Sequence, residues 1–206
     1  MLDDLLVPTS LHPEQPTSGS RIGRMSAPQL GLVVLFVSMT VLFGASLVAY
    51  LITRAQSPVW RTPEMPHLPL GLLASTAILG ALSVFMHRAV RAVRENRNEG
   101  LVRELHFALV SAAAFLVCQS SNWKTMIPAL HGTDPYARYA FTFYWLTALH
   151  AAHVVGGFVP LGIVVARARR SQYSSSRHEG VRLCRQYWDY LGVVWIVLLA
   201  TLYFAT

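Results

Sequence analysis

The sequence predicts an all-α, polytopic membrane protein that folds as a bundle of five transmembrane helices. Of its 206 residues, 53% are hydrophobic and only 13% are charged. Five apolar runs approach or exceed the roughly 20 residues that a helix needs to cross a bilayer. They occupy about residues 30–53, 69–86, 105–123, 140–166 and 187–204. Little sequence is left between the runs, so we expect one transmembrane domain over residues 30–206.

The positions of the basic residues predict how the bundle is oriented. Of the 17 Lys and Arg residues, only Arg54, Arg61, Lys124 and Arg138 lie on the side that follows the first run. The other side holds Arg21, Arg24, Arg88, Arg91, Arg94, Arg97, Arg103, Arg167, Arg169, Arg170, Arg177, Arg182 and Arg185. The positive-inside rule then places the N-terminus in the cytoplasm and the C-terminus outside. Because topology and contacts with anionic lipid head groups explain the basic excess, we expect no nucleic-acid partner.

Residues 1–29 have the composition of a flexible cytoplasmic tail. Prolines recur there among Ser, Thr and Gly, and the segment lacks the apolar mass to fold alone. Its run Leu2–Val7 is too short, and lacks the preceding basic residue, for a secretory signal. This run is either part of the disordered tail or a docking segment for a partner. The proline-rich segment 54–67 is expected to be an extracytoplasmic loop.

The two cysteines are not expected to pair. Cys118 lies near the outer end of the third run, whereas Cys184 lies in the cytoplasmic segment before the fifth. A disulfide requires Cα atoms within about 7 Å of each other, which opposite membrane surfaces exclude. The sequence contains no CxxC motif, so it gives no support to a sulfur-ligated metal site.

The fourth run carries two features that predict helix packing. Ala148, Ala152 and Gly156 repeat every four residues and form a small-residue stripe that allows close approach of a neighbouring helix. His150 and His153 lie on another face, more than about 100° away around the helix. We therefore expect the fourth helix to contact protein on two sides, in a central position.

The two histidines admit three interpretations. They could bind haem or a metal with His87 or His106, but those two lie near the cytoplasmic boundary rather than at mid-membrane. They could belong to a proton or transport path, although Asp189 is the only carboxylate we place at membrane depth.

The favoured interpretation is structural, because polar groups in hydrocarbon need hydrogen-bond partners. On this interpretation His150, His153, Gln119 and Asp189 form hydrogen bonds between helices and to a partner chain.

Two motifs resemble those of a known family. Residues 146–157 read Leu-Thr-Ala-Leu-His-Ala-Ala-His-Val-Val-Gly-Gly, and residues 187–195 read Tyr-Trp-Asp-Tyr-Leu-Gly-Val-Val-Trp. They are similar to the Leu-Thr-Gly-Leu-His-x-x-His-Val-x-x-Gly and Tyr-Trp-His-Phe-Val-Asp-Val-Val-Trp patterns of subunit III of the haem–copper oxidases. The resemblance covers roughly residues 28–206. It singles out His150, His153, Gly156, Tyr187, Trp188, Asp189 and Trp195, with weaker matches at Gln119 and Trp123.

The resemblance implies the short, five-helix form of that family, with its N-terminus inside. It implies an accessory subunit of a cytochrome c or quinol oxidase in the cytoplasmic membrane of a prokaryote. Such a chain is not catalytic and binds no haem or copper itself, since these lie in the catalytic subunit I. It packs on that subunit and other oxidase subunits, holds phospholipid, and supports oxygen reduction coupled to proton pumping.

The chain departs from the family at several titratable positions. Thr40 and Asn122 stand where the family has glutamates, and Asp189 and Gly192 replace a His and an Asp. Loss of these groups favours a structural role over a role in proton transfer. The alternatives are a relative that accompanies nitric oxide reductase, a standalone small transporter or a b-type cytochrome.

Overall fold

A computed structural model describes residues 26–57, 60, 71–130 and 136–204. Apart from an isolated bridge between Ser174 and Arg177, the regular structure in these residues is helical. The predicted all-α fold with five spans is confirmed, since all five helices are long and apolar enough to cross a membrane. Their bounds are α1 Ala27–Ala55, α2 Gly71–Arg94, α3 Asn98–Leu130, α4 Tyr136–Arg169 and α5 Glu179–Phe204. Most of the predicted tail and of the loop 54–67 lies outside the described residues.

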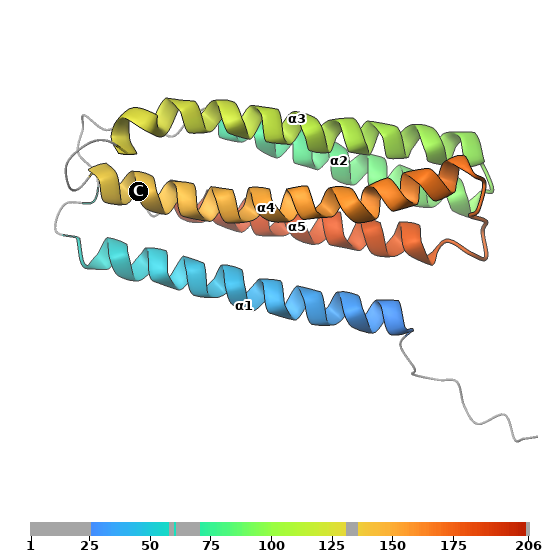
Figure 1. Cartoon of the computed structure of the whole chain (residues 1–206), viewed down its shortest axis with the longest axis horizontal. Helices are drawn as coiled ribbons and strands as arrows, with labels where there is room; N and C mark the ends of the chain where they lie inside the picture. The colour runs from blue at the N-terminus through green and yellow to red at the C-terminus, as the bar shows by residue number, and fades with distance from the viewer. Residues whose placement is uncertain (1–25, 58–59, 61–70, 131–135, 205–206) are drawn as a thin grey trace, which may run out of the picture.

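Four of the helices form a two-layered bundle, and the first helix lies to one side of it. Figure 1 shows α3 and α4 in front of α2 and α5, with α1 running along the α4 and α5 side. Helix α4 contacts α1, α3 and α5, while α5 contacts α1, α2 and α4. Among the described residues α1 contacts only α4 and α5. Helix α4 therefore has the central position that its sequence predicts.

The helices extend beyond the apolar runs that reveal them. Helix α2 continues to Arg94 and α3 begins at Asn98, so only three residues connect them. Asn96 in this connection has a φ of 54°, a left-handed conformation that Asn adopts more readily than most residues. Helix α5 likewise begins at Glu179, eight residues before its predicted span. Hydropathy marks only the part of a helix in hydrocarbon, whereas backbone hydrogen bonding continues into the polar surface.

The beginning of α1 is fixed by a capping box. The Ser26 side chain accepts a hydrogen bond from the Gln29 backbone N–H, and the Gln29 side chain bonds back to the Ser26 N–H. These contacts satisfy backbone donors that every helix start leaves open. The Ser26 hydroxyl also donates to Glu179 Oε1 at 2.6 Å. The first turns of α1 and α5 are thereby joined.

The basic connections lie together at one end of the molecule. Figure 1 shows the start of α1, the α2–α3 turn and the α4–α5 turn at the same end. The arginines predicted to be cytoplasmic from residue 88 onward lie on these connections or the helix turns beside them. The fold thus groups the charges that the sequence assigns to one side of the membrane.

Candidate functional site

The side chain of His150 lies in an aromatic cluster at the centre of the bundle. It is 0% exposed. Its ring centroid lies 5.1 Å from that of Trp195 on α5, 5.6 Å from that of Phe115 on α3 and 6.3 Å from that of Phe43 on α1. One residue of α4 therefore packs against three other helices, and the motif at residues 146–157 meets the motif at residues 187–195 through the His150–Trp195 contact.

Between the described helices, His150 and Gln119 do not form the hydrogen bonds that the sequence predicts. Both side chains are buried, and within the described part of the chain neither has a hydrogen-bond partner. His150 lacks such a partner because its surroundings are aromatic. Phe43, Phe115 and Trp195 present ring surfaces to it. The interaction of His150 with neighbouring helices is thus ring packing, in which an imidazole behaves as a flat aromatic body.

His153 uses its backbone rather than its ring to form a hydrogen bond with a second helix. Its Nδ1 lies 2.8 Å from the carbonyl oxygen of Leu149 in the same helix. The Tyr187 hydroxyl donates to the His153 carbonyl at 2.8 Å and so ties α5 to α4. The His153 ring lies 5.1 Å from that of Phe43 on α1. This residue therefore contacts α5 through its carbonyl and α1 through its ring.

Gly157 allows α4 and α5 to approach closely. A Cβ atom there would lie 2.8 Å from Cε1 of Tyr187 and 2.9 Å from Cζ2 of Trp188. Real Cβ atoms essentially never approach other atoms so closely, so the two rings occupy the space that a side chain would need. Gly157 ends the first motif, and Tyr187 and Trp188 begin the second. The two motifs therefore pack directly against each other.

The remaining motif residues form polar contacts between helices. Trp195 Nε1 donates to Thr76 Oγ1 at 2.9 Å, which joins α5 to α2. Trp123 Nε1 donates to Thr147 Oγ1 at 3.0 Å, which joins α3 to α4. Asn122, which replaces a family glutamate, donates from Nδ2 to Ser75 Oγ at 3.3 Å.

Thr40 joins α1 to α5. Its hydroxyl oxygen lies 2.8 Å from that of Tyr190. The Tyr190 ring also stacks on Phe36 with a centroid separation of 4.5 Å. A neutral hydroxyl pair and a ring stack therefore occupy this position, and no charge is needed there.

Asp189 faces α2, away from the histidine pair. Its Oδ1 accepts a hydrogen bond from Ser83 at 2.6 Å, while Oδ2 lies 3.6 Å from Arg185 Nε and 3.7 Å from His87 Nε2. The expected interhelical hydrogen bond of Asp189 is thus present, between α5 and α2. His106, by contrast, bonds only to the Val102 carbonyl of its own helix among the described residues.

The histidines do not gather into a metal site. The described residues contain no group of three His, Cys, Asp or Glu side chains that could hold a metal ion, so His87 and His106 do not join His150 in one. Cys118 and Cys184 are both free, in agreement with the prediction that they do not pair.

The small-residue stripe lies on the outside of α4. Ala148, Ala152 and Gly156 are exposed, and no helix in the described part of the chain covers Ala148 or Ala152. The stripe therefore does not hold together this chain's own bundle. Its close packing with a helix of another molecule stays a prediction.

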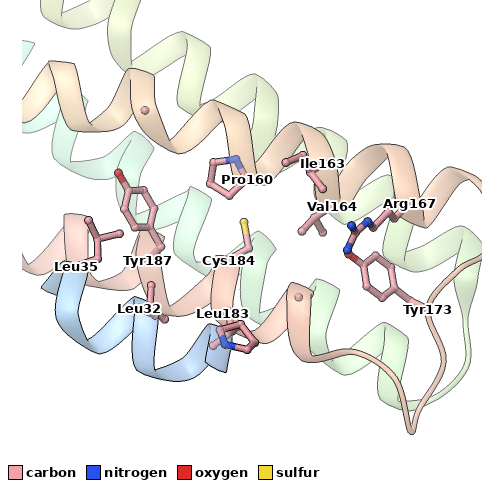
Figure 2. Close-up of a pocket in the computed structure, with 14 residues that line it drawn as sticks. Leu32, Leu35, Pro160, Ile163, Val164, Arg167, Tyr173, Leu183, Cys184 and Tyr187 are labelled. Carbon is pink, nitrogen blue, oxygen red and sulfur yellow. The ribbon is translucent and has the colours of Figure 1, made fainter. Parts of the chain in front are cut away.

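An apolar groove between α1, α4 and α5 was not predicted from the sequence. Its volume is about 440 Å³, and Figure 2 shows Leu32, Leu35, Pro160 and Ile163 along it. Gly31 and Gly156 also line it, and their lack of side chains widens it. The glycines and prolines that line it are its sequence signals. Their position on facing helices becomes apparent only once the fold is known.

The groove ends in polar side chains at the basic end of the bundle. Arg167 and Tyr173 line it there, and Figure 2 shows the Arg167 guanidinium against the Tyr173 ring. Both residues also line an adjoining polar cavity of about 730 Å³ that includes Arg177. Burial raises the pKa of Tyr173, an effect that nearby Arg167 partly offsets. Tyr173 therefore stays neutral beside the Arg167 cation.

Comparison with known proteins identifies the family. Residues 19–206 match the family model of cytochrome c oxidase subunit III. A cytochrome c oxidase subunit 3 from Synechocystis sp. is 32% identical over 91% of this chain and 81% of its own length. The Thermostichus vulcanus protein of that name is 30% identical over 86% of this chain and 87% of its own. A probable cytochrome c oxidase subunit 3 from Nocardia farcinica is 29% identical over 89% of this chain and 92% of its own. The chain belongs to the subunit III family of the haem–copper oxidases.

Proposed function

We propose that this chain is the accessory subunit III of a respiratory terminal oxidase and assembles with its catalytic subunit I in a prokaryotic cytoplasmic membrane. The observation that carries this proposal is the contact between the two family motifs, with His150 of the first packed on Trp195 of the second. Haem and copper would lie in the partner, where they carry out oxygen reduction coupled to proton pumping. The residues of this chain serve assembly, because the motif side chains join helices to one another.

Co-purification tests this function. We expect the tagged chain, extracted in mild detergent, to bring haem-containing oxidase subunits with it, and the isolated chain to lack haem absorbance. Replacing His150 and His153 by Gln should cost about 1–3 kcal/mol, mainly through lost ring packing of His150, and leave the haem spectrum of the assembled oxidase unchanged. Haem absorbance in the isolated chain that disappears in the double variant would instead show that these histidines are ligands. The unmodified chain, purified in parallel, is the control.

We also propose that the N-terminus is cytoplasmic and the C-terminus outside. The grouping of the basic connections at one end of the bundle supports this orientation. The chain before Ser26 would then lie in the cytoplasm, and the helices from Ala27 to Phe204 would form the transmembrane domain; the predicted tail boundary at residue 29 is wrong, because α1 begins at Ala27.

Cysteine labelling tests the orientation. Ser176, in the α4–α5 turn, and Gln56, just after α1, are both exposed at opposite ends of the bundle. We expect a membrane-impermeant maleimide to label Gln56→Cys but not Ser176→Cys in spheroplasts. In inside-out vesicles the pattern should be the reverse. The unmodified chain gives the background labelling from Cys118 and Cys184. Labelling of Ser176→Cys in spheroplasts would show that the orientation is the reverse of the one proposed.

The groove between α1, α4 and α5 is proposed to hold a membrane phospholipid. Its apolar walls suit an acyl chain, and Arg167 with neutral Tyr173 suits the phosphate at the membrane surface. The adjoining polar cavity, which contains Arg177, offers room for the rest of the head group. Glu179 also lines that cavity and lies 3.8 Å from Arg182.

A further inference from the structure

A second groove lies on the opposite layer of the bundle, between α2 and α5. Its volume is about 490 Å³. Helices α2 and α5 form the rear layer in Figure 1, whereas the lipid groove lies beside α1. The walls of this α2–α5 groove are Thr76, Gly80 and Ser83 on one helix and Gly192, Val193 and Ile196 on the other.

Each wall contributes a glycine whose outer side is open. A Cβ added at Gly80 or at Gly192 would meet no atom within 4 Å. Neither glycine is therefore required for packing among the described residues. Small residues on a membrane helix let another helix approach its backbone closely. Val193 and Ile196, which are 61% and 59% exposed, supply apolar surface beside the glycines.

The α2–α5 groove also contains a carboxylate with one oxygen still open to a donor. Asp189 Oδ1 accepts from Ser83 at 2.6 Å. Oδ2 forms an ion pair with Arg185 Nε at 3.6 Å and lies 3.7 Å from Nε2 of His87, which also lines the groove; neither distance is as short as a hydrogen bond. The Asp189 side chain is 29% exposed in this groove. It can therefore accept a hydrogen bond from outside the chain.

The depth of Asp189 decides what covers it. The apolar run of helix α5 begins at Tyr187, eight residues after the start of the helix. Asp189 follows Tyr187 by two residues and therefore lies about 3 Å inside the hydrocarbon layer. Ionisable side chains within that layer face protein rather than lipid tails.

We propose that the α2–α5 groove is the docking surface for a transmembrane helix of another oxidase subunit. That helix has small residues against Gly80 and Gly192 and a hydrogen-bond donor side chain facing Oδ2 of Asp189. The open glycines give the close approach, and the carboxylate fixes the register of the two helices. This inference rests on the proposed function, because it specifies which face of the subunit meets its partner.

Photo-crosslinking in the assembled oxidase tests the docking surface. A benzoylphenylalanine at Val193 should crosslink to an oxidase subunit. The matched control is Val117 on α3, which is 68% exposed on another helix. Crosslinks from Val117 alone would place the interface on α3 and overturn the proposal. Crosslinks from Val193 only to lipid, in an oxidase that still co-purifies, would overturn the docking surface and leave the proposed function standing.

Glycine substitutions give an independent measurement. The double variant Gly80→Leu, Gly192→Leu should reduce association with the oxidase by at least about tenfold, because the added side chains prevent close approach. The control Gly162→Leu places the same side chain at an exposed, equally open position of α4. It should co-purify normally. The thermal transition of each isolated chain shows that it is folded.

Two outcomes separate the docking surface from the function on which it rests. Equal co-purification of the folded double variant and the Gly162→Leu control would contradict the docking surface alone. Absence of co-purification for every chain, including the unmodified one, would contradict the proposed function itself.

Discussion

Replacing Gly157 by Leu should destabilise this subunit more than a change at any other glycine of α4. A side chain at this position has no room, because its Cβ would lie 2.8 Å from the Tyr187 ring and 2.9 Å from the Trp188 ring. Tyr187 is held by its hydrogen bond to the His153 carbonyl, and Trp188 is only 1% exposed. The rings therefore cannot move aside without separating α4 from α5. We expect a loss of about 3 kcal/mol, the upper part of the range for overpacking.

The measurement is the thermal transition of the purified chain in mild detergent. Gly157→Ala should lie between the Leu variant and the unmodified chain, because it adds only the Cβ atom. The control is again Gly162→Leu, where a Cβ would meet nothing within 4 Å. That change should alter stability by no more than about 0.5 kcal/mol. Equal melting of the Gly157 and Gly162 variants would show that the two helices do not approach as described.

Filling the apolar groove should remove most of the phospholipid that stays with the purified subunit. The variant Gly31→Leu, Gly156→Leu places a bulky side chain on each side of the groove. It should fold, because a Cβ at Gly31 meets nothing within 4 Å and one at Gly156 meets only the Tyr187 hydroxyl, at 3.8 Å. Arg167→Gln leaves the groove open but removes a cation. It should weaken retention of an anionic lipid about fivefold, which corresponds to roughly 1 kcal/mol per basic residue.

Native mass spectrometry of the purified complex measures the bound lipid. The matched control is Gly44→Leu, which changes another open glycine of α1 that does not line the groove. It should retain lipid like the unmodified chain. Unchanged lipid stoichiometry in the Gly31, Gly156 double variant would show that the groove is not the lipid site. A lower stoichiometry in the Gly44 variant alone would locate the lipid elsewhere on α1.

The spans were predictable from sequence because membrane solvation places a strong condition on composition. A helix such as α1 has to be apolar over nearly its whole length, and this shows in any window along it. The central position of α4 was predicted from its histidine face and its small-residue stripe; the histidine face packs on other helices, whereas the stripe is exposed. The ends of the helices were not predictable in this way, since residues such as Arg91 and Arg94 form helix without contributing to the apolar signal.

The neighbours of His150 could not be predicted from the sequence. Helical periodicity tells which residues share a face, but Phe43, Phe115 and Trp195 come from three other helices. We assumed that a buried imidazole takes a hydrogen-bond partner, whereas its surroundings are aromatic. The stripe that includes Ala148 shows the same difficulty. Spacing identifies a surface fit for close approach without saying whether the chain itself or another molecule covers it.

The isolation of α1 has a consequence for the order of events during synthesis. Among the described residues its contacts are with α4 and α5, and its first turn is joined to Glu179. Roughly 120 residues separate the end of α1 from Glu179, which at about 5–20 residues per second takes the ribosome on the order of 6–24 s. Helix α1 must therefore wait in the bilayer until α5 has been made. Its apolar surface, mostly exposed even in the finished fold, lets it reside there alone without a protein neighbour.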